Sequence, residues 1–196
     1  FIFKSTDGAR TWEDTGFPGG WVVDMAASSL DADSLYVVDS YYVYKTADAG
    51  DSWSYVKKDS LEEQLSGACG VPACCYCVME MGPCCPSCGG YDFSCPITSI
   101  DVAYDDNDNA YVFIGTRKHC SGLDLDGDCN LDEFPGEVYW ICEGGFPSNW
   151  SGLGLDCYRS GTYDALAVGC APDWADSHET YVVVSTDDDN GNGTTW

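Results

Sequence analysis

The chain has 196 residues, which is long enough to bury one sizeable hydrophobic core. It carries 33 acidic residues against 8 basic ones, and the net charge of -25 argues against binding to nucleic acid or to an anionic membrane surface. A hydrophobic content of 44% is typical of a globular protein, and no apolar run reaches the roughly 18 residues of a membrane span.

The first part of the chain reads as short β-strands in a repeating order. Residues 1–12 are predicted to be the end of one repeat, a strand followed by a turn. Residues 13–53 are predicted to form a complete repeat, because Trp53 follows Trp12 by 41 residues, a length that suits a four-stranded unit. Its β-branched and aromatic runs predict strands at 21–26, 34–38 and 41–45, and a fourth strand that starts at Trp53.

Residues 54–150 are predicted to form a third repeat that carries two insertions. The insertions span about residues 60–96, with eight cysteines, and about 116–136, which is acidic. The remaining sequence predicts strands at 97–104, 110–115 and 137–141. Residues 151–196 are predicted to form a fourth repeat, with strands at 163–168 and 179–184. All 196 residues therefore read as one domain of repeats, with no linker between them.

A turn motif follows the third strand of the complete repeat. It reads Thr46-Ala47-Asp48-Ala49-Gly50-Asp51-Ser52-Trp53, a pattern of Ser or Thr, Asp, Gly and Trp at fixed spacing. We expect the aspartate to accept hydrogen bonds from backbone N–H groups further along the turn, and the tryptophan to cover the hairpin. The role predicted for these residues is structural. The positions that carry the motif in its three copies are Ser5, Asp7 and Trp12; Thr46, Asp48, Gly50 and Trp53; and Ser185, Asp187, Gly193 and Trp196.

This motif resembles the Asp-box, or BNR repeat, of β-propellers such as sialidases, sortilin-type receptors and xyloglucanases. The resemblance implies an all-β fold, a propeller of four-stranded Asp-box blades. Propellers close with about four to eight blades. The chain is therefore predicted to be either a piece of a longer propeller, the preferred interpretation, or a four-bladed ring whose last blade is completed by the N-terminal strand.

Cysteine is abundant, which is typical of a protein from an oxidising compartment. We expect most of the cysteines in the first insertion to form disulfides, because that segment has too few apolar residues to fold without cross-links. The Cys85-Pro86-Ser87-Cys88 sequence leaves zinc binding or redox chemistry as alternatives. The odd total leaves at least one cysteine without an intrachain partner. The thirteen candidates for disulfides are Cys69, Cys74, Cys75, Cys77, Cys84, Cys85, Cys88, Cys95, Cys120, Cys129, Cys142, Cys157 and Cys170.

The acidic insertion resembles an EF-hand or dockerin-type calcium loop. Carboxylates at alternate positions are the ligands that calcium prefers in such loops. Two residues depart from the pattern, since Cys129 stands where glycine is expected and Pro135 where a bidentate glutamate is expected. The alternative is a solvated acidic turn. The predicted calcium ligands are Asp124, Asp126, Asp128, Asn130, Asp132 and Glu133.

The sequence favours a non-catalytic extracellular or cell-surface protein. Its net charge suits an ion-rich exterior, and Asn149 and Asn192 begin N-x-S/T sequons that are compatible with glycosylation. A sialidase of the Asp-box type needs an arginine cluster, whereas this chain has only Arg10, Arg117 and Arg159. No catalytic residue is predicted. We expect a structural or adhesive component of a surface layer or sheath whose partners are copies of itself, other cell-surface proteins or glycans. The alternatives are a secreted glycoside hydrolase and a sortilin-like binding module.

Overall fold

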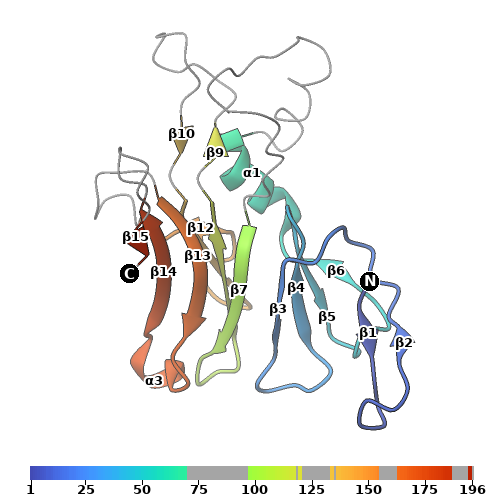
Figure 1. Ribbon diagram of the computed structural model, residues 1–196. Coiled ribbons are helices and arrows are strands. Elements are labelled where there is room, and N and C mark those ends of the chain that lie inside the picture. Colours follow the sequence, from blue (N-terminus) through green and yellow to red (C-terminus); the bar gives the residue numbers. More distant parts are fainter. Residues whose placement is uncertain are drawn as a thin grey trace, which may run out of the picture.

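The protein is mostly β, and its strands form several antiparallel sheets that follow one another along the chain (Figure 1). The structure is a computed structural model that describes residues 1–69, 97–117, 119–120, 133–134, 136–154, 163–186 and 194–195. In that part of the chain, no helix is long and apolar enough to cross a membrane.

Two sheets have four strands each. In the sheet that we call sheet II, each strand pairs with the next along the chain, and the strands are β3 (Asp24–Ala27), β4 (Leu35–Val38), β5 (Val43–Thr46) and β6 (Ser54–Tyr55). Sheet III repeats this order with β7 (Ile97–Tyr104), β8 (Ala110–Thr116), β11 (Val138–Glu143) and β12 (Ser151–Gly152). Between β8 and β11 lies a two-stranded ribbon of β9 (His119–Cys120) and β10 (Glu133–Phe134).

The outer two sheets are smaller. Sheet I consists of β1 (Phe3–Lys4) and β2 (Glu13–Asp14). Sheet IV consists of β13 (Tyr163–Cys170), β14 (Thr180–Thr186) and β15 (Thr194–Thr195). The short helix α3 (Trp174–Ser177) lies in the connection from β13 to β14. Figure 1 places sheets I and IV at opposite ends of the row, with sheets II and III between them.

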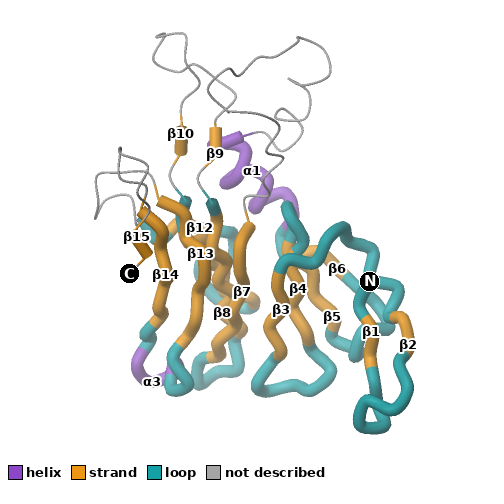
Figure 2. The backbone as a smooth tube through the Cα atoms, viewed as in Figure 1, coloured by secondary structure: helices purple, strands orange, loops and turns teal. Residues whose placement is uncertain are grey.

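Sheets II, III and IV meet through their first strands. Strand β7 of sheet III packs against β3 of sheet II on one side and against β13 of sheet IV on the other (Figure 2). Gly115 on β8 allows the close approach of sheet IV, because a Cβ at this position would lie 2.9 Å from the backbone oxygen of Ala165. The main hydrophobic core lies between sheets II and III, where Tyr36 and Val38 pack with Ile114.

Two aspartates at the same place in successive sheets form hydrogen bonds across these contacts. Asp24 and Asp101 each lie three residues before the end of the first strand. Asp24 accepts a hydrogen bond from the N–H of Ile100 on β7 at 3.1 Å, and Asp101 accepts one from the N–H of Cys170 on β13 at 2.6 Å. First strands are edge strands with N–H groups that the sheet itself leaves unpaired, so these carboxylates satisfy donors that would otherwise need water.

Further side chains connect sheets III and IV. The hydroxyl of Thr98 donates to the carbonyl oxygen of Ala165, and the hydroxyl of Ser99 accepts from the N–H of Val168 at 3.1 Å. The side chain of Ser99 is 5% exposed. Buried polar links of this kind fix the register of one sheet against the next, because a shift would leave both partners unsatisfied.

The strand predictions are confirmed with small shifts of their ends. The strand expected at 97–104 is β7, with the same bounds, and those expected at 34–38 and 110–115 are β4 and β8. The expected all-β architecture needs correction, since the described residues include the short helix α3 and the longer helix α1 (Lys58–Cys69), which begins just before the predicted insertion at 60–96 and continues into it. Leu61 and Leu65 are one helical turn apart and fully buried, so α1 packs into the main core.

Candidate functional site

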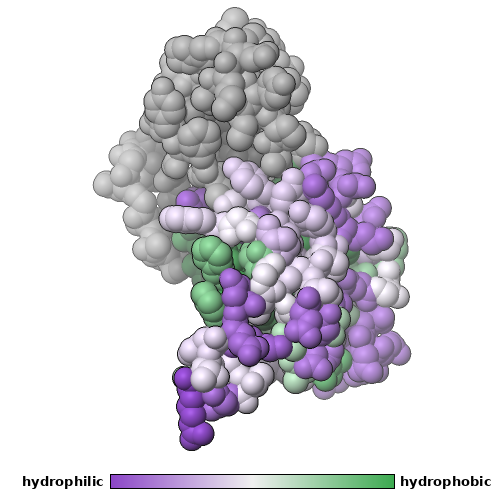
Figure 3. Space-filling view, turned by 90° about the vertical axis from the view of Figure 1, so that its right-hand side faces the viewer, coloured by the Kyte–Doolittle hydropathy of each residue, from purple (hydrophilic) through white to green (hydrophobic). Residues whose placement is uncertain are grey.

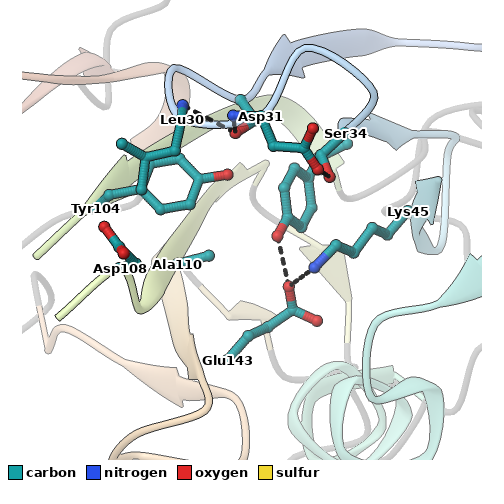
Figure 4. A pocket seen from close by; sticks show the side chains of 10 residues that line it. Leu30, Asp31, Ser34, Lys45, Tyr104, Asp108, Ala110 and Glu143 are labelled. Carbon is teal, nitrogen blue, oxygen red and sulfur yellow. Dashed lines mark hydrogen bonds and ion pairs between the residues drawn. The ribbon is translucent and has the colours of Figure 1, made fainter. Parts of the chain in front are cut away.

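A pocket of about 470 Å³ opens between sheets II and III. It lies at the end where the β3–β4 and β7–β8 turns project, and Figure 4 shows its walls. The turn between β3 and β4 forms one side, and the ends of β7 and β11 form the other. The lining residues are Ser28, Leu30, Asp31, Ser34, Tyr36, Lys45, Tyr104, Asp108, Ala110 and Glu143.

Glu143 connects the two sheets at the base of the pocket. Its Oε2 atom accepts a hydrogen bond of 2.5 Å from the hydroxyl of Tyr36 and lies 2.8 Å from Nζ of Lys45 (Figure 4). Lys45 also lies over the Tyr36 ring, 5.0 Å from its centroid. The side chains of Lys45 and Glu143 are 27% and 28% exposed, so the ion pair is only partly solvated. Burial, and then the bond to Glu143, raise the pKa of Tyr36 well above its usual range, so the phenol stays protonated and donates.

The other acidic side chains of the pocket come from turns. Asp31 accepts from the N–H of Asp33 at 3.0 Å and from the hydroxyl of Ser34 at 2.8 Å, and these bonds lower its pKa. Asp108 lies in the β7–β8 turn with a φ of 63°. With Glu143, the pocket has three carboxylates against one lysine and therefore favours cationic or hydroxyl-rich ligands. A general acid needs a raised pKa, and the lowered pKa of Asp31 makes this residue unsuitable for that role.

The two turns with the Asp-box pattern have matching geometry. In the turn at 46–53, Asp48 accepts from the N–H of Ser52 at 2.8 Å and from its hydroxyl at 2.6 Å. The hydroxyl of Thr46 donates to Asp48 at 2.7 Å and accepts from the N–H of Gly50 at 2.8 Å. Gly50 has a φ of 92°, a conformation that glycine adopts without strain.

The turn at 5–12 repeats these contacts one sheet earlier. Asp7 accepts from the N–H and from the hydroxyl of Thr11, at 2.9 and 2.8 Å, and Ser5 accepts from the N–H of Ala9 at 2.8 Å. Ala9 takes the place of Gly50 and keeps a positive φ, 67°. The bonds from Thr11 and Ser52 lower the pKa of Asp7 and Asp48 to about 2. Both aspartates therefore act as turn-forming acceptors, which is the structural role that the sequence predicts.

The third copy of the motif has a different position in its sheet. Ser185 lies on β14, which pairs directly with the first strand β13, whereas the turn at 46–53 follows β5, which pairs with the second strand β4. The sequence match therefore does not mark the equivalent turn of sheet IV. Asp187, Gly193 and Trp196 lie outside the described residues. The tryptophans of the first two copies also differ, since Trp12 is 59% exposed while Trp53 packs against Phe17 with ring centroids 5.0 Å apart.

Most of the predicted metal and disulfide residues lie outside the described part of the chain. This holds for the calcium loop at 124–132, and only the backbone of Glu133 is described, on β10. The part that is described contains no group of three His, Cys, Asp or Glu side chains that could hold a metal ion. Cys142 and Cys170 are the two cysteines with described side chains, and both are free thiols rather than the disulfide partners that were predicted.

The surroundings of these two thiols agree with a free state. Cys142 is buried next to Tyr111, whose pKa is raised to about 12, chiefly by a hydrogen bond with Cys142. Burial, and then the neighbouring Asp101, raise the pKa of Cys170 to about 12, so its thiol stays protonated at neutral pH.

Of the two sequons, the one at Asn149 lies on an exposed position before β12, and Asn192 is outside the described residues.

The sequence alone did not identify the residues that connect the sheets. Lys45, one of only 8 basic residues, follows the apolar Val43 and Tyr44 on β5, and this was the one available signal. Its partner Glu143 follows 98 positions later, and the bond that the N–H of Ile100 donates to Asp24 spans 76.

Neither a scan of the chain against protein-family models nor a search of curated proteins finds a match.

Proposed function

We propose that the sheets are blades of an Asp-box β-propeller. The proposal is supported by the shared strand order of sheets II and III, by the contacts of β7 with both neighbouring first strands, and by the two matching turns at 5–12 and 46–53. First strands that lie side by side around an axis, with later strands further out, are the arrangement of propeller blades.

The function that this scaffold supports best is that of a non-catalytic component of an extracellular or cell-surface assembly. The observation that carries the proposal is the exposure of large apolar side chains in sheets II and IV. Trp21, which precedes β3, and Met25, on β3, are 88% and 59% exposed, and Tyr181 and Val183 on β14 are 63% and 47% exposed. Exposed apolar surface is typical of protein interfaces, so these positions suit contacts with other subunits.

Calcium is the ion that we propose for this assembly. A net charge of -25 makes close association of subunits unfavourable unless cations neutralise part of it. The acidic segment with Asp124, Asp126, Asp128 and Asp132 has the spacing of a calcium loop. Removal of calcium should therefore weaken both the loop and the contacts between subunits.

Sedimentation velocity of the purified chain in millimolar calcium and in excess EGTA tests this function. We expect larger species in calcium and a shift to smaller ones in EGTA, with no turnover of chromogenic glycosides in either buffer. A protein that stays monomeric in calcium and hydrolyses a glycoside would contradict the proposal.

The pocket between sheets II and III favours a second candidate, a glycoside hydrolase. It combines tyrosines with Asp31, Asp108 and Glu143, and such enzymes use two carboxylates on either side of the glycosidic bond. Glu143→Gln and Asp31→Asn would each abolish hydrolysis if the pocket were catalytic. Equal activity of both variants and the wild type, or no activity in any of them, would reject this candidate.

A further inference from the structure

The pocket between sheets II and III has a balanced ion pair at its base and two aspartates at its rim. At the base, Nζ of Lys45 lies 2.8 Å from Glu143, and Lys45 is the one basic side chain among the described lining residues. At the rim, Asp31 belongs to the β3–β4 turn of sheet II and Asp108 to the β7–β8 turn of sheet III (Figure 4). Each wall of the pocket therefore carries one carboxylate that is left over once Lys45 is paired with Glu143.

Both rim carboxylates have free capacity to accept hydrogen bonds. Among the described residues, the carboxylate of Asp108 has no hydrogen bond or ion pair. Asp31 accepts one bond at each oxygen, from the N–H of Asp33 at 3.0 Å and from the hydroxyl of Ser34 at 2.8 Å, and a carboxylate oxygen can accept two. Both rim aspartates are exposed, so a ligand in the pocket can reach them.

The buried hydroxyl groups of the pocket already donate to carboxylates. Ser34 is 8% exposed and donates to Asp31, and Tyr36, which is fully buried, donates to Glu143 at 2.5 Å. A sugar hydroxyl both donates and accepts, whereas an ammonium group only donates. A pocket with free acceptors and engaged donors therefore matches ammonium groups better than hydroxyl groups.

The rest of the lining supplies an apolar surface. Leu30, which is next to Asp31, is 54% exposed, and Tyr104 packs against the main core and also lines the pocket. Burial of an alkyl chain against these side chains is favourable, and an aromatic ring attracts a nearby ammonium group. The pocket thus combines carboxylates for charged groups with an apolar surface for a carbon chain.

A single metal ion does not fit this arrangement. The rim aspartates belong to different sheets, and the described residues contain no group of three His, Cys, Asp or Glu side chains that could hold an ion. Separate carboxylates match a ligand whose positive charges are also apart. The net charge of -25 attracts cations of any kind, and hydrophilic residues cover much of the lower end of the molecule in Figure 3, the end to which the β3–β4 turn projects in Figure 1. A test must therefore separate binding in the pocket from attraction to the whole molecule.

We infer that this pocket binds a linear diamine or polyamine. One ammonium group pairs with Asp31, a second pairs with Asp108, and the alkyl chain between them lies against Leu30 and Tyr104. The volume of about 470 Å³ is within the range of small-molecule sites. The bound ligand connects the turns of sheets II and III. The inference goes beyond the assembly function proposed above and does not depend on it.

The test is isothermal titration calorimetry of the 196-residue chain with cadaverine, in a buffer that contains EGTA. Asp108→Asn removes one rim charge, and asparagine tolerates the positive φ of 63° at this position, so the turn should keep its conformation. We expect the affinity for cadaverine to fall about threefold, the effect of one partly exposed ion pair. Asp106→Asn is the matched control, because Asp106 is exposed in the same turn but does not line the pocket. Butylamine, which has only one charge, should bind more weakly than cadaverine. Near-ultraviolet circular dichroism confirms that each variant is folded.

Cadaverine binding that weakens in Asp108→Asn and stays unchanged in Asp106→Asn supports the inference. An equal affinity of the two variants, whether reduced or unchanged, overturns it, because cadaverine then responds only to the overall charge or binds elsewhere. The absence of cadaverine binding to the wild type overturns it as well. A methyl glycoside that binds the wild type and not Asp108→Asn, while cadaverine binds neither, overturns it in favour of a carbohydrate site. None of these outcomes alters the sedimentation test of the assembly function.

Discussion

Replacement of Asp101 by alanine should destabilise the protein by about 2 kcal/mol. The carboxylate accepts a bond of 2.6 Å from the N–H of Cys170 on the neighbouring sheet and a local one of 2.8 Å from the N–H of Val102. A hydrogen bond to a charged group contributes about 1.5–3 kcal/mol, and we assign nearly all of the effect to the bond between sheets, because Val102 is the next residue. For a chain of this size, 2 kcal/mol corresponds to a decrease in Tm of roughly 4–8 °C.

Urea unfolding followed by tryptophan fluorescence measures this difference as a change of midpoint. Asp106→Ala is the matched control, since Asp106 is an exposed aspartate in the turn of the same sheet. We expect the control to stay within about 0.5 kcal/mol of the wild type. If Asp101→Ala did the same, the carboxylate would not hold sheets III and IV together, and the account of how neighbouring sheets are connected would be wrong.

Three further outcomes follow from the structure. The hydrogen bonds from Ser52 lower the pKa of Asp48 to about 2, below the ordinary 3.8. The contribution of this carboxylate to the stability of the fold is therefore present above about pH 4 and is lost as the pH falls through 2. An NMR titration of its carboxyl carbon with a midpoint near 4 would contradict this. Trp150 is 1% exposed and donates through Nε1 to the carbonyl of Val56 at 3.0 Å. Trp150→Ala should therefore lower the free energy of unfolding in urea by about 3–5 kcal/mol. Trp21→Ala, at an 88% exposed position, is the control and should change it little. Asp126→Asn should lower calcium affinity in isothermal titration calorimetry by about tenfold, with Asp106→Asn as the control, and the absence of a calcium signal in the wild type would reject the predicted loop.

The sequence predicted the strands well because strand formation depends on local patterns. The run Ile97–Tyr104 has β-branched and apolar residues at alternate positions and ends at turn residues, so its bounds could be predicted from the sequence alone. The Asp-box turns were equally local, since each aspartate bonds to residues no more than four positions away. Helix α1 was missed although Leu61 and Leu65 carried a helical signal, because the nearby cysteines suggested a disulfide-rich segment instead.

The contacts between sheets could not be predicted in the same way. The ion pair of Lys45 with Glu143 and the bond that the N–H of Cys170 donates to Asp101 depend on which sheets lie side by side, a property of the packed structure. The match that begins at Ser185 follows the second strand of its sheet, and its Asp187, Gly193 and Trp196 lie outside the described part of the chain. A turn motif reports the local conformation of the chain, and only the pairing of β14 with β13 reveals its place in the sheet.

The central claim is that neighbouring sheets pack through their first strands, with β7 between β3 and β13. An experimental electron-density or cryo-EM map of the chain tests it most directly. The account predicts that the carboxylates of Asp24 and Asp101 each reach the backbone of the next first strand. A map in which the sheets stack face to face as a sandwich, with these two carboxylates in solvent, would contradict it.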